Sequence, residues 1–468
     1  MTAPAQAQTA PAALTWSSCS TTVKDWSKYH GDETRLECSP LSVPLDYSKP
    51  DGRKIQLAVS RLKATDPAQR KGVLMVNSGG PGLSSLDAPL SYADTGLGAL
   101  NTDHDFVGFD PRGTGYGDTV ICDPADPTSP PPTATAKEKA KFGFDRETAY
   151  NKRCLAMDPA FTQQLTTANV ARDMDSLRAA MGEQKIDFYG ASWGTGLGAN
   201  YRSLFDSHVA GMWLESVMPP TMDLESMDDA VEAVGQKSFD GLTAWLAQRD
   251  FDFHFGTTAA AVAKALYDLR DQLTRNPRVT GSGASQVVVD GSTVSNYFGG
   301  GAGNWATAGR ELANIRDGGA PAGASPATAH SSVFGFDQDF PGANQLQLRA
   351  VMCNDGTGGR DFDKMWADTQ DRARKYPATG GHSVNDNQCG SWPAAQPWQL
   401  KKGTSPLAMS GHTDEDTTPY AWAVAMHAQI GGTLITVHDA RHGSIKDRPC
   451  VSMVVDFLRA GVAPSGSC

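Results

Sequence analysis

The residues KIDFYGASWGTG, numbered 185–196, decide the fold. Residues 185–189 are predicted to form a strand, and the segment from Trp193 onward is predicted to be a helix. Between them lies the pattern G-x-S-x-G at 190–194, whose glycines permit the sharp turn that lifts a serine hydroxyl out of a sheet. Ser192 is therefore predicted to be a nucleophile. A chance match among 48 glycines is the alternative, and the flanking strand and helix argue against it.

Strands and helices alternate on both sides of this turn. The apolar runs at 72–77 and 105–110 each end in a glycine-rich turn, and residues 169–181 carry apolar side chains at helical spacing. Strand-like alternation returns at 406–410 and 433–437. This alternation predicts an α/β fold whose sheet is mainly parallel and flanked by helices.

The strand pattern is interrupted in the middle of the chain. Helical stretches at 230–248, 259–273, 305–316 and 364–375 and glycine-rich loops fill that part. A sheet domain split by a large, mostly helical insertion explains this order. The predicted division is a flexible segment at 1–15, the first part of the sheet domain at 16–220, the helical cap insertion at 221–400 and the second part of the sheet domain at 401–468.

A serine nucleophile needs a histidine base and a carboxylate that orients the base. In hydrolases with this strand–turn–helix element the chain order is serine, acid, histidine. His442 follows the last predicted strand and is favoured over His438, which falls at the strand end. The acid should follow the strand at 406–410, where Asp414 is the first choice and Asp416 the alternative.

Backbone N–H groups are expected to stabilise the oxyanion. The Trp193 N–H lies at the predicted helix start, where it can donate to a developing negative charge. Gly79 or Gly80, in the glycine-rich turn after the strand at 72–77, should supply the second donor. A plain tight turn is the alternative interpretation of these glycines.

Composition limits the partners. The chain has 41 basic and 52 acidic side chains and a net charge of −11, which disfavours nucleic acid as a partner. No apolar stretch reaches membrane-spanning length, so no membrane span is expected. His412, Asp414 and Asp416 lack a second histidine group at ligand spacing, so no metal is expected. Catalysis by a serine, a histidine and a carboxylate requires no organic cofactor. The chain is expected to be a monomer.

The cysteines are even in number, scattered and never spaced as C-x-x-C. This pattern favours disulfides formed in an oxidising compartment, and pairing in chain order closes short loops. The Ala/Pro-rich start resembles the segment left after removal of a signal peptide, so the chain is expected to be secreted. The predicted disulfide cysteines are Cys19, Cys38, Cys122, Cys154, Cys353, Cys389, Cys450 and Cys468.

Together these motifs resemble the secreted tripeptidyl aminopeptidases, relatives of proline iminopeptidase within the α/β-hydrolase superfamily. The resemblance implies a triad of Ser192, Asp414 and His442, a cap over the active site, and export. It also implies release of short peptides, such as tripeptides, from substrates with a free amino terminus. The resembling stretches are 43–47 with 50–52, 79–82, 110–115, 172–178, 190–195, 414–419, and 442–443 with Cys450.

The chain departs from the family pattern around the nucleophile. Asn77 and Ser78 precede the glycine turn, Trp193 follows the nucleophile, and Glu215 lies in the segment after the nucleophile helix. Asn77 and Glu215 are predicted to contact the substrate. The cap and the walls of the substrate pocket determine which substrate binds. An ester, lactone or small-molecule amide is therefore the alternative to a peptide substrate. A non-catalytic binding protein on the same scaffold is a third hypothesis.

Overall fold

The computed structural model describes residues 13–22, 35–123, 128, 130–131, 134–280, 287–321, 343–381 and 388–468. Most of the N-terminal segment predicted at 1–15 lies outside these ranges.

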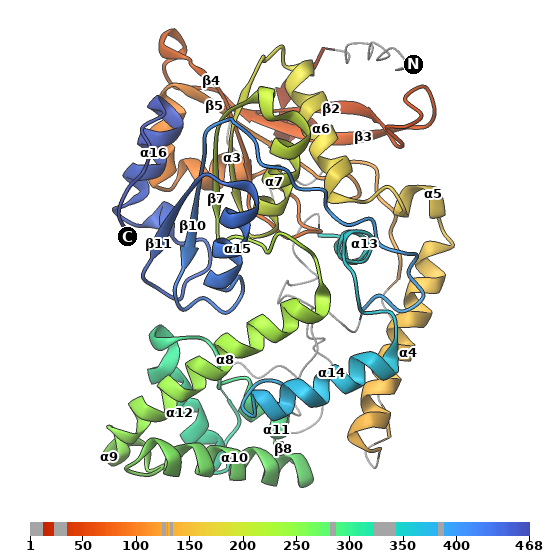
Figure 1. Cartoon of the computed structure of the whole chain (residues 1–468). Helices are drawn as coiled ribbons and strands as arrows, with labels where there is room; N and C mark the ends of the chain where they lie inside the picture. The colour runs from red at the N-terminus through yellow and green to blue at the C-terminus, as the bar shows by residue number, and fades with distance from the viewer. Residues whose placement is uncertain are drawn as a thin grey trace.

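A nine-stranded sheet forms the centre of the molecule, with the strand order β1-β2-β3-β5-β4-β6-β7-β10-β11 (Figure 1). The pairs from β1 to β5 along one edge are antiparallel, and every pair from β5 to β11 is parallel. The mainly parallel sheet predicted from the sequence is therefore confirmed. The strands are β1 (Ser17–Ser18), β2 (Leu36–Pro44), β3 (Lys54–Leu62), β4 (Gly72–Asn77), β5 (His104–Phe109), β6 (Ile186–Ala191), β7 (Val209–Glu215), β10 (Leu407–His412) and β11 (Thr433–Val437).

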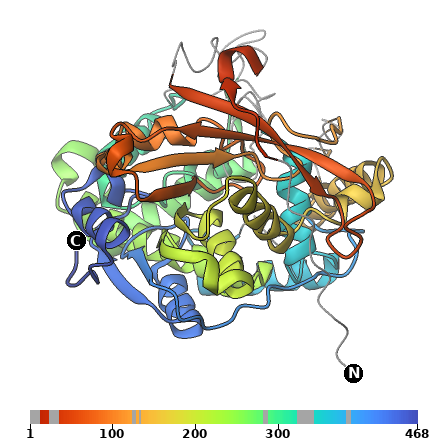
Figure 2. The same cartoon turned by 90° about the horizontal axis from the view of Figure 1, so that it is seen from above.

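Helices cover both faces of this sheet (Figure 2). One apolar core joins the sheet to α6 (Thr167–Ala180), α7 (Trp193–Phe205) and α15 (Tyr420–Ile430). A second core on the other face includes α3 (Ala88–Ala93) and α16 (Val451–Ala460). Because both faces are covered, every residue of β4, β5, β6 and β10 is buried, which explains their nearly continuous apolar sequences.

Between β7 and β10 the chain forms a second, mostly helical layer below the sheet (Figure 1). Its own apolar core gathers side chains such as Phe239, Leu242 and Phe298. The layer contains α8 (Leu224–Ala247), α9 (Asp250–Phe253), α10 (Ala259–Arg275), β8 (Arg278–Thr280), β9 (Val287–Val289), α11 (Gly291–Ser295), α12 (Trp305–Arg316) and α14 (Phe362–Lys375). By contrast α13 (Gln345–Asp355), from the same part of the chain, packs in the core of the sheet. The division at 220 and 400 stays a prediction.

One long helix outside the insertion links the two layers. α4 (Ala136–Leu155) starts at a capping box in which Thr135 and Glu138 satisfy each other's backbone N–H groups. Its Phe144 ring lies 5.8 Å, centroid to centroid, from the Phe362 ring at the start of α14. The short helices α1 (Cys19–Thr22) and α5 (Pro159–Thr162) complete the list.

The cysteines pair in chain order, as predicted. The four bonds are Cys19–Cys38, Cys122–Cys154, Cys353–Cys389 and Cys450–Cys468. Cys19–Cys38 and Cys450–Cys468 lie near the two ends of the sheet domain. Cys122–Cys154 joins α4 to the loop before it, and Cys353–Cys389 joins α13 to a later loop.

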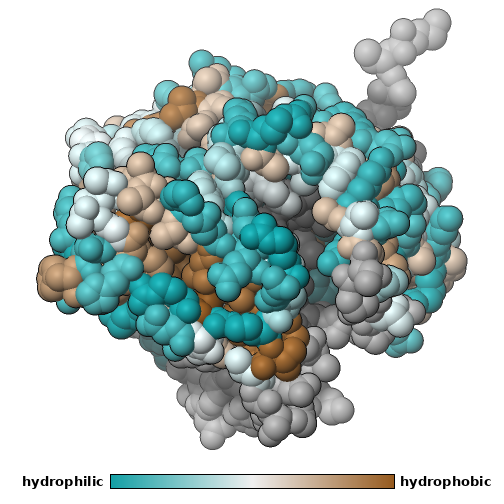
Figure 3. Space-filling view, turned by 90° about the horizontal axis from the view of Figure 1, so that it is seen from below, coloured by the Kyte–Doolittle hydropathy of each residue, from teal (hydrophilic) through white to brown (hydrophobic). Residues whose placement is uncertain are grey.

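The surface of the helical layer is mostly hydrophilic, with separate small hydrophobic patches (Figure 3). Among the described residues, no helix combines the length and the apolar composition that a membrane crossing needs.

Candidate active site

Ser192 lies at the turn between β6 and α7 in a backbone conformation that side chains rarely adopt. Its φ is 57° and its ψ is −129°. Such strain costs on the order of 1–3 kcal/mol and persists only when neighbours hold it. The Ser192 N–H donates to the Glu215 carbonyl at 3.0 Å, and the Thr195 hydroxyl donates to the Ser192 carbonyl at 2.6 Å. The structure thus forms the sharp serine turn that the G-x-S-x-G pattern predicts, with Ser192 partly exposed.

The glycine turn after β4 lies against this serine. Gly79 has a φ of 109°, and a Cβ atom there would lie 2.7 Å from the Ser192 Cβ. Only glycine permits this approach. The Gly79 N–H, however, donates to the Asn77 side chain at 3.0 Å. No described residue accepts a hydrogen bond from Gly80, so Gly80 is the better candidate for the second oxyanion donor beside Trp193.

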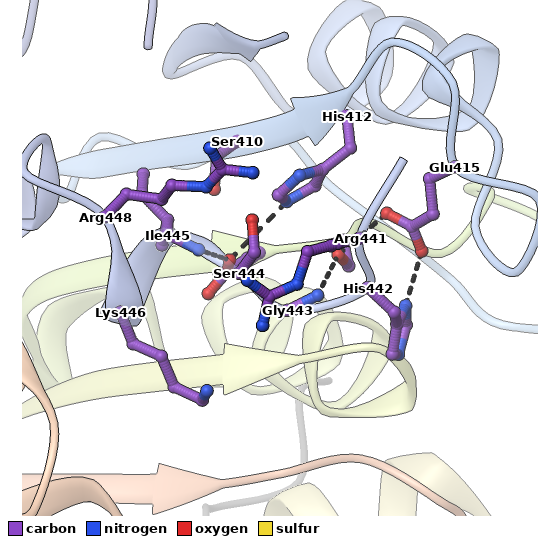
Figure 4. Close-up of polar contacts among 12 residues, drawn as sticks. Ser410, His412, Glu415, Arg441, His442, Gly443, Ser444, Ile445, Lys446 and Arg448 are labelled. Carbon is purple, nitrogen blue, oxygen red and sulfur yellow. Dashed lines mark hydrogen bonds and ion pairs between the residues drawn. The ribbon is translucent and has the colours of Figure 1, made fainter. Parts of the chain in front are cut away.

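The carboxylate that faces His442 is Glu415. The His442 Nδ1 and a Glu415 carboxylate oxygen form a short hydrogen bond, drawn as a dashed line in Figure 4. The Glu415 side chain is completely buried, whereas 35% of the His442 side chain is exposed. The carboxylate of the pair is thus shielded from solvent, whereas the imidazole is accessible to solvent.

Asp414, the acid predicted from the sequence, is wrong as the partner of His442. Its side chain is 51% exposed and forms an ion pair with Lys237 of α8 at 2.8 Å. The alternative, Asp416, accepts a hydrogen bond from the Gly300 N–H at 3.2 Å. The turn after β10 directs Glu415 inward and both of its acidic neighbours toward the helical layer.

Hydrogen bonds hold Glu415 in its ionised form. The Ser216 hydroxyl donates to one carboxylate oxygen at 2.9 Å, and the Thr418 N–H donates to the other at 3.0 Å. Burial alone raises the pKa of Glu415, but the hydrogen bonds from His442 and Thr418 outweigh burial and bring the pKa below its ordinary value. A carboxylate that is charged and fixed in place can accept the Nδ1–H of His442, which leaves Nε2 as the basic nitrogen.

A second histidine lies beneath the same loops. His412 is completely buried, with its Nδ1 2.6 Å from an Asp439 oxygen and its Nε2 3.5 Å from a Glu215 oxygen. Burial lowers the pKa of His412, but these two carboxylates outweigh burial and raise it above its ordinary value. Asp439 also accepts a hydrogen bond from the Ser444 hydroxyl at 2.6 Å. The cluster therefore fixes the loop that carries His442.

Glu215 and Asn77, predicted to contact the substrate, are both completely buried. Glu215 accepts hydrogen bonds from the Tyr189 hydroxyl and, at 2.5 Å, from the Ile445 N–H. The Asn77 side chain donates to the Ser85 hydroxyl at 3.2 Å in addition to accepting from Gly79. The prediction of direct contact is wrong because neither side chain has surface for a substrate. Both position the loops of the site.

Two of the motifs that carry the family resemblance support the fold around the site. Arg112 and Asp173 form a completely buried ion pair, with Nε and Nη2 donating at 2.7 and 2.6 Å to the two carboxylate oxygens. Asp110 accepts from the Ser84 hydroxyl at 2.6 Å and from the Tyr116 N–H at 2.8 Å. Burial raises the pKa of Asp110 to about 6. These contacts fix the loops at the carboxyl ends of β4 and β5.

The residues weighed as a metal cluster point to separate partners. His412 pairs with Asp439, Asp414 with Lys237, and Asp416 with a backbone N–H. Within the described ranges, no group of three His, Cys, Asp or Glu side chains has the arrangement of a metal site.

The comparisons with known proteins identify the family of the chain. The family model described as the alpha/beta hydrolase fold matches residues 72–281, and the model described as TAP-like protein matches residues 376–468. The tripeptidyl aminopeptidase of Streptomyces lividans is 30% identical over 479 residues, covering 98% of this chain and 86% of the relative. The chain belongs to the tripeptidyl aminopeptidase family. It is a serine hydrolase of the peptidase type with an α/β-hydrolase fold.

Other relatives of the peptidase carry different names. Serine protease Hip1 of Mycobacterium tuberculosis is 27% identical over 456 residues, covering 91% of this chain and 86% of the relative. Carboxylesterase B of Mycobacterium tuberculosis is 29% identical over 487 residues, covering 97% of this chain and 89% of the relative.

Two residues of the site, Glu415 and Ser216, were not predicted from the sequence. Glu415 lies between the two aspartates that were weighed, and a glutamate satisfies the order serine, acid, histidine equally well. The order alone could therefore have included it. Ser216 has a φ of 53° and joins Glu415 to the Gly443 N–H, to which it is bonded at 2.9 Å. No pattern in the sequence indicates that contact.

Proposed function

We propose that the peptidase is an extracellular aminopeptidase that releases tripeptides from free amino termini through a triad of Ser192, His442 and Glu415. The observation that carries the proposal is the His442–Glu415 pair, which is buried at the acid and accessible at the imidazole. Ser216 bonds to both Glu415 and Gly443, and it directly follows Glu215, whose carbonyl accepts a hydrogen bond from the Ser192 N–H. The similarity to the tripeptidyl aminopeptidase of Streptomyces lividans supports the substrate class.

The proposed reaction has two stages. The Ser192 hydroxyl oxygen attacks the carbonyl carbon while His442 Nε2 takes the hydroxyl proton, and Glu415 stabilises the imidazolium. The Trp193 and Gly80 N–H groups stabilise the oxyanion. His442 then gives the proton to the leaving amine as the C–N bond breaks, which leaves an acyl-enzyme. Water attacks this ester with His442 as base, and Ser192 regains its proton.

Export is the second part of the proposal. All eight cysteines are paired, and structural disulfides persist in oxidising compartments. The acidic net charge of −11 suits a soluble enzyme that acts on peptides rather than on nucleic acids.

Ester hydrolysis is the second candidate function. Carboxylesterase B matches the chain over nearly the same length as the aminopeptidase does. The same triad can hydrolyse an ester because an alkoxide leaves more easily than an amine. The two functions differ in whether the enzyme requires a substrate ammonium group.

A paired turnover assay tests the proposal. It compares a tripeptide anilide with a free amino terminus, its N-acetylated twin and a short-chain aryl ester, with Ser192→Ala as the control for each. Cleavage of the free anilide but not of the acetylated one is the expected result. Turnover of the ester alone would contradict the peptidase assignment and favour the esterase.

A further inference from the structure

A cavity of about 730 Å³ lies between the helical layer and the loops after β10 and β11. Its size falls within the range of about 300–1,000 Å³ that ligand pockets occupy. The lining includes Asp414, the neighbour of Glu415, and Arg441, the neighbour of His442. The two loops that carry the proposed acid–base pair thus border the cavity, although Ser192, Glu415 and His442 are not among the residues that line it. The mechanism above does not use this cavity.

The glycine-rich turn before α12 closes one side of this cavity. The Gly301 N–H donates to the Ser238 hydroxyl of α8 at 2.9 Å, and the Gly300 N–H donates to Asp416. A Cβ atom on Gly301 would lie 2.6 Å from the Ala440 Cβ, two residues before His442. The helical layer thus contacts the loop of the proposed base by its backbone, and the cavity extends along that loop.

The lining of the cavity has one more basic than acidic side chain, in a protein that is acidic overall. Lys237, Arg441 and Arg448 face Asp414 and Asp439, which gives one excess positive charge. The two carboxylates are already neutralised, because Asp414 pairs with Lys237 at 2.8 Å and Asp439 pairs with Arg448. Arg441 is exposed, and no described carboxylate forms an ion pair with its guanidinium. Figure 4 shows Arg441 beside His442.

We propose that this cavity binds the departing part of the peptide and that Arg441 binds a carboxylate in it. The proposal rests on the proposed function. His442 must protonate the leaving amine, so the departing chain starts at His442. A carboxylate on the first residue after the scissile bond then lies within the reach of the adjacent arginine. The carboxylate can belong to an acidic side chain or to a free carboxyl terminus, and an arginine fork fits either one.

The test uses tetrapeptides that share one N-terminal tripeptide. The fourth residue is Asp or Asn, each with a free or an amidated carboxyl terminus, and release of this residue is measured by chromatography. The tripeptide anilide, which has no carboxylate in its leaving group, reports on the triad alone. The variant is Arg441→Gln. The matched control is Arg275→Gln, an exposed arginine in the last turn of α10.

Arg441→Gln is expected to lower kcat/KM about 3- to 10-fold for the substrates that carry a carboxylate and to leave the anilide unchanged. The Asp and free-terminus arms show which carboxylate Arg441 binds. Added salt should reduce the preference of the wild type, because Arg441 is exposed. Arg275→Gln should change nothing.

Equal turnover of all four tetrapeptides by the wild type would overturn the proposal. So would an equal loss on the anilide and the peptides in Arg441→Gln. If the wild type cleaves no free tripeptide anilide, the proposed aminopeptidase function itself fails. That failure is distinguishable from a failure of the proposed role of Arg441, which the tetrapeptides test.

Discussion

Two histidine–carboxylate pairs join the end of β10 and the loop that follows it to the loop after β11, and the partners of each pair are 27 residues apart in the sequence. His412, the last residue of β10, pairs with Asp439, and Glu415, in the loop after β10, pairs with His442. His412 is completely buried, whereas His442 is 35% exposed. Figure 4 shows both histidines.

We infer from this difference that burial, rather than the identity of the two partners, separates the positioning pair from the pair proposed to react. His412 lies between two carboxylates, which favour its charged form and fix the loop. His442 has one carboxylate and an accessible face, so it can gain and lose a proton during turnover. The His412–Asp439 pair fixes the backbone of the loop that carries His442.

The largest expected effect on activity is that of Ser192→Ala, which removes the nucleophile proposed to react with the accessible His442. We expect kcat to fall by about 10⁴-fold or more, because the attacking oxygen is lost. The thermal midpoint should stay within a few degrees of the wild-type value, because alanine removes only one partly exposed hydroxyl. Turnover of the tripeptide anilide and a thermal scan measure the two effects. Activity above a tenth of wild type would contradict the assignment of the nucleophile.

His412→Gln tests the buried side. Removal of the imidazolium leaves the completely buried Glu215 without the cation beside it, while Asp439 keeps its ion pair with Arg448. We therefore expect a loss of about 3–5 kcal/mol in the free energy of unfolding. Urea unfolding measures it. His438→Gln is the matched control, since His438 is an exposed histidine that directly follows β11. If the two variants unfold at the same urea concentration, His412 does not fix the loop.

The two pairs should also lose their stabilising effects at opposite ends of the pH scale. The pKa of His412 is raised in the folded protein, so its contribution is complete below the unfolded value of about 6.5 and is lost as pH rises through the folded value. The pKa of Glu415 is lowered, so its contribution is complete above about 4.3 and is lost as pH falls through the folded value.

Unfolding of wild type and His412→Gln across pH checks this sign. The difference between them should be largest below pH 6.5 or so and should shrink as pH rises further. A difference that grows with pH would contradict a charged His412.

The smallest effect is expected at the ion pair between the two layers. Lys237 and Asp414 are 68% and 51% exposed, and such pairs contribute about 0–1 kcal/mol. Lys237→Gln should therefore change kcat/KM for the anilide by less than about 3-fold. A loss of kcat/KM as large as that of a triad variant would contradict this expectation. It would mean that the contact between Lys237 of α8 and Asp414 positions Glu415.

Much of the fold was predictable because local patterns agree with the tertiary structure. The apolar runs at 72–77 and 105–110 became β4 and β5 almost residue for residue, because strands buried on both faces need continuous apolar sequence. The helix predicted at 305–316 is α12. α13, by contrast, has buried residues all around and little helical periodicity, so its pattern carried no clear signal.

Less of the site was predictable. Ser192 and His442 of the proposed triad were predicted from the turn pattern around the serine and from the chain order of serine, acid and histidine. The acid depends on which of three consecutive carboxylates the turn after β10 directs inward, and that direction is set by Ser216, Thr418 and His442. These contacts join distant segments, so no spacing in the sequence indicates them. The partners of Glu215, Tyr189 and Ile445, also lie on distant segments. The sequence therefore did not indicate that Glu215 is buried and positions the loops.

The central claim is that Glu415, rather than its neighbour Asp414, orients and stabilises His442. The most direct test is kcat/KM for the free tripeptide anilide with Glu415→Gln and Asp414→Asn, both nearly isosteric and both removing one charge. The account predicts a loss of about 10²–10⁴-fold for Glu415→Gln and less than about 3-fold for Asp414→Asn. The reverse order would contradict it.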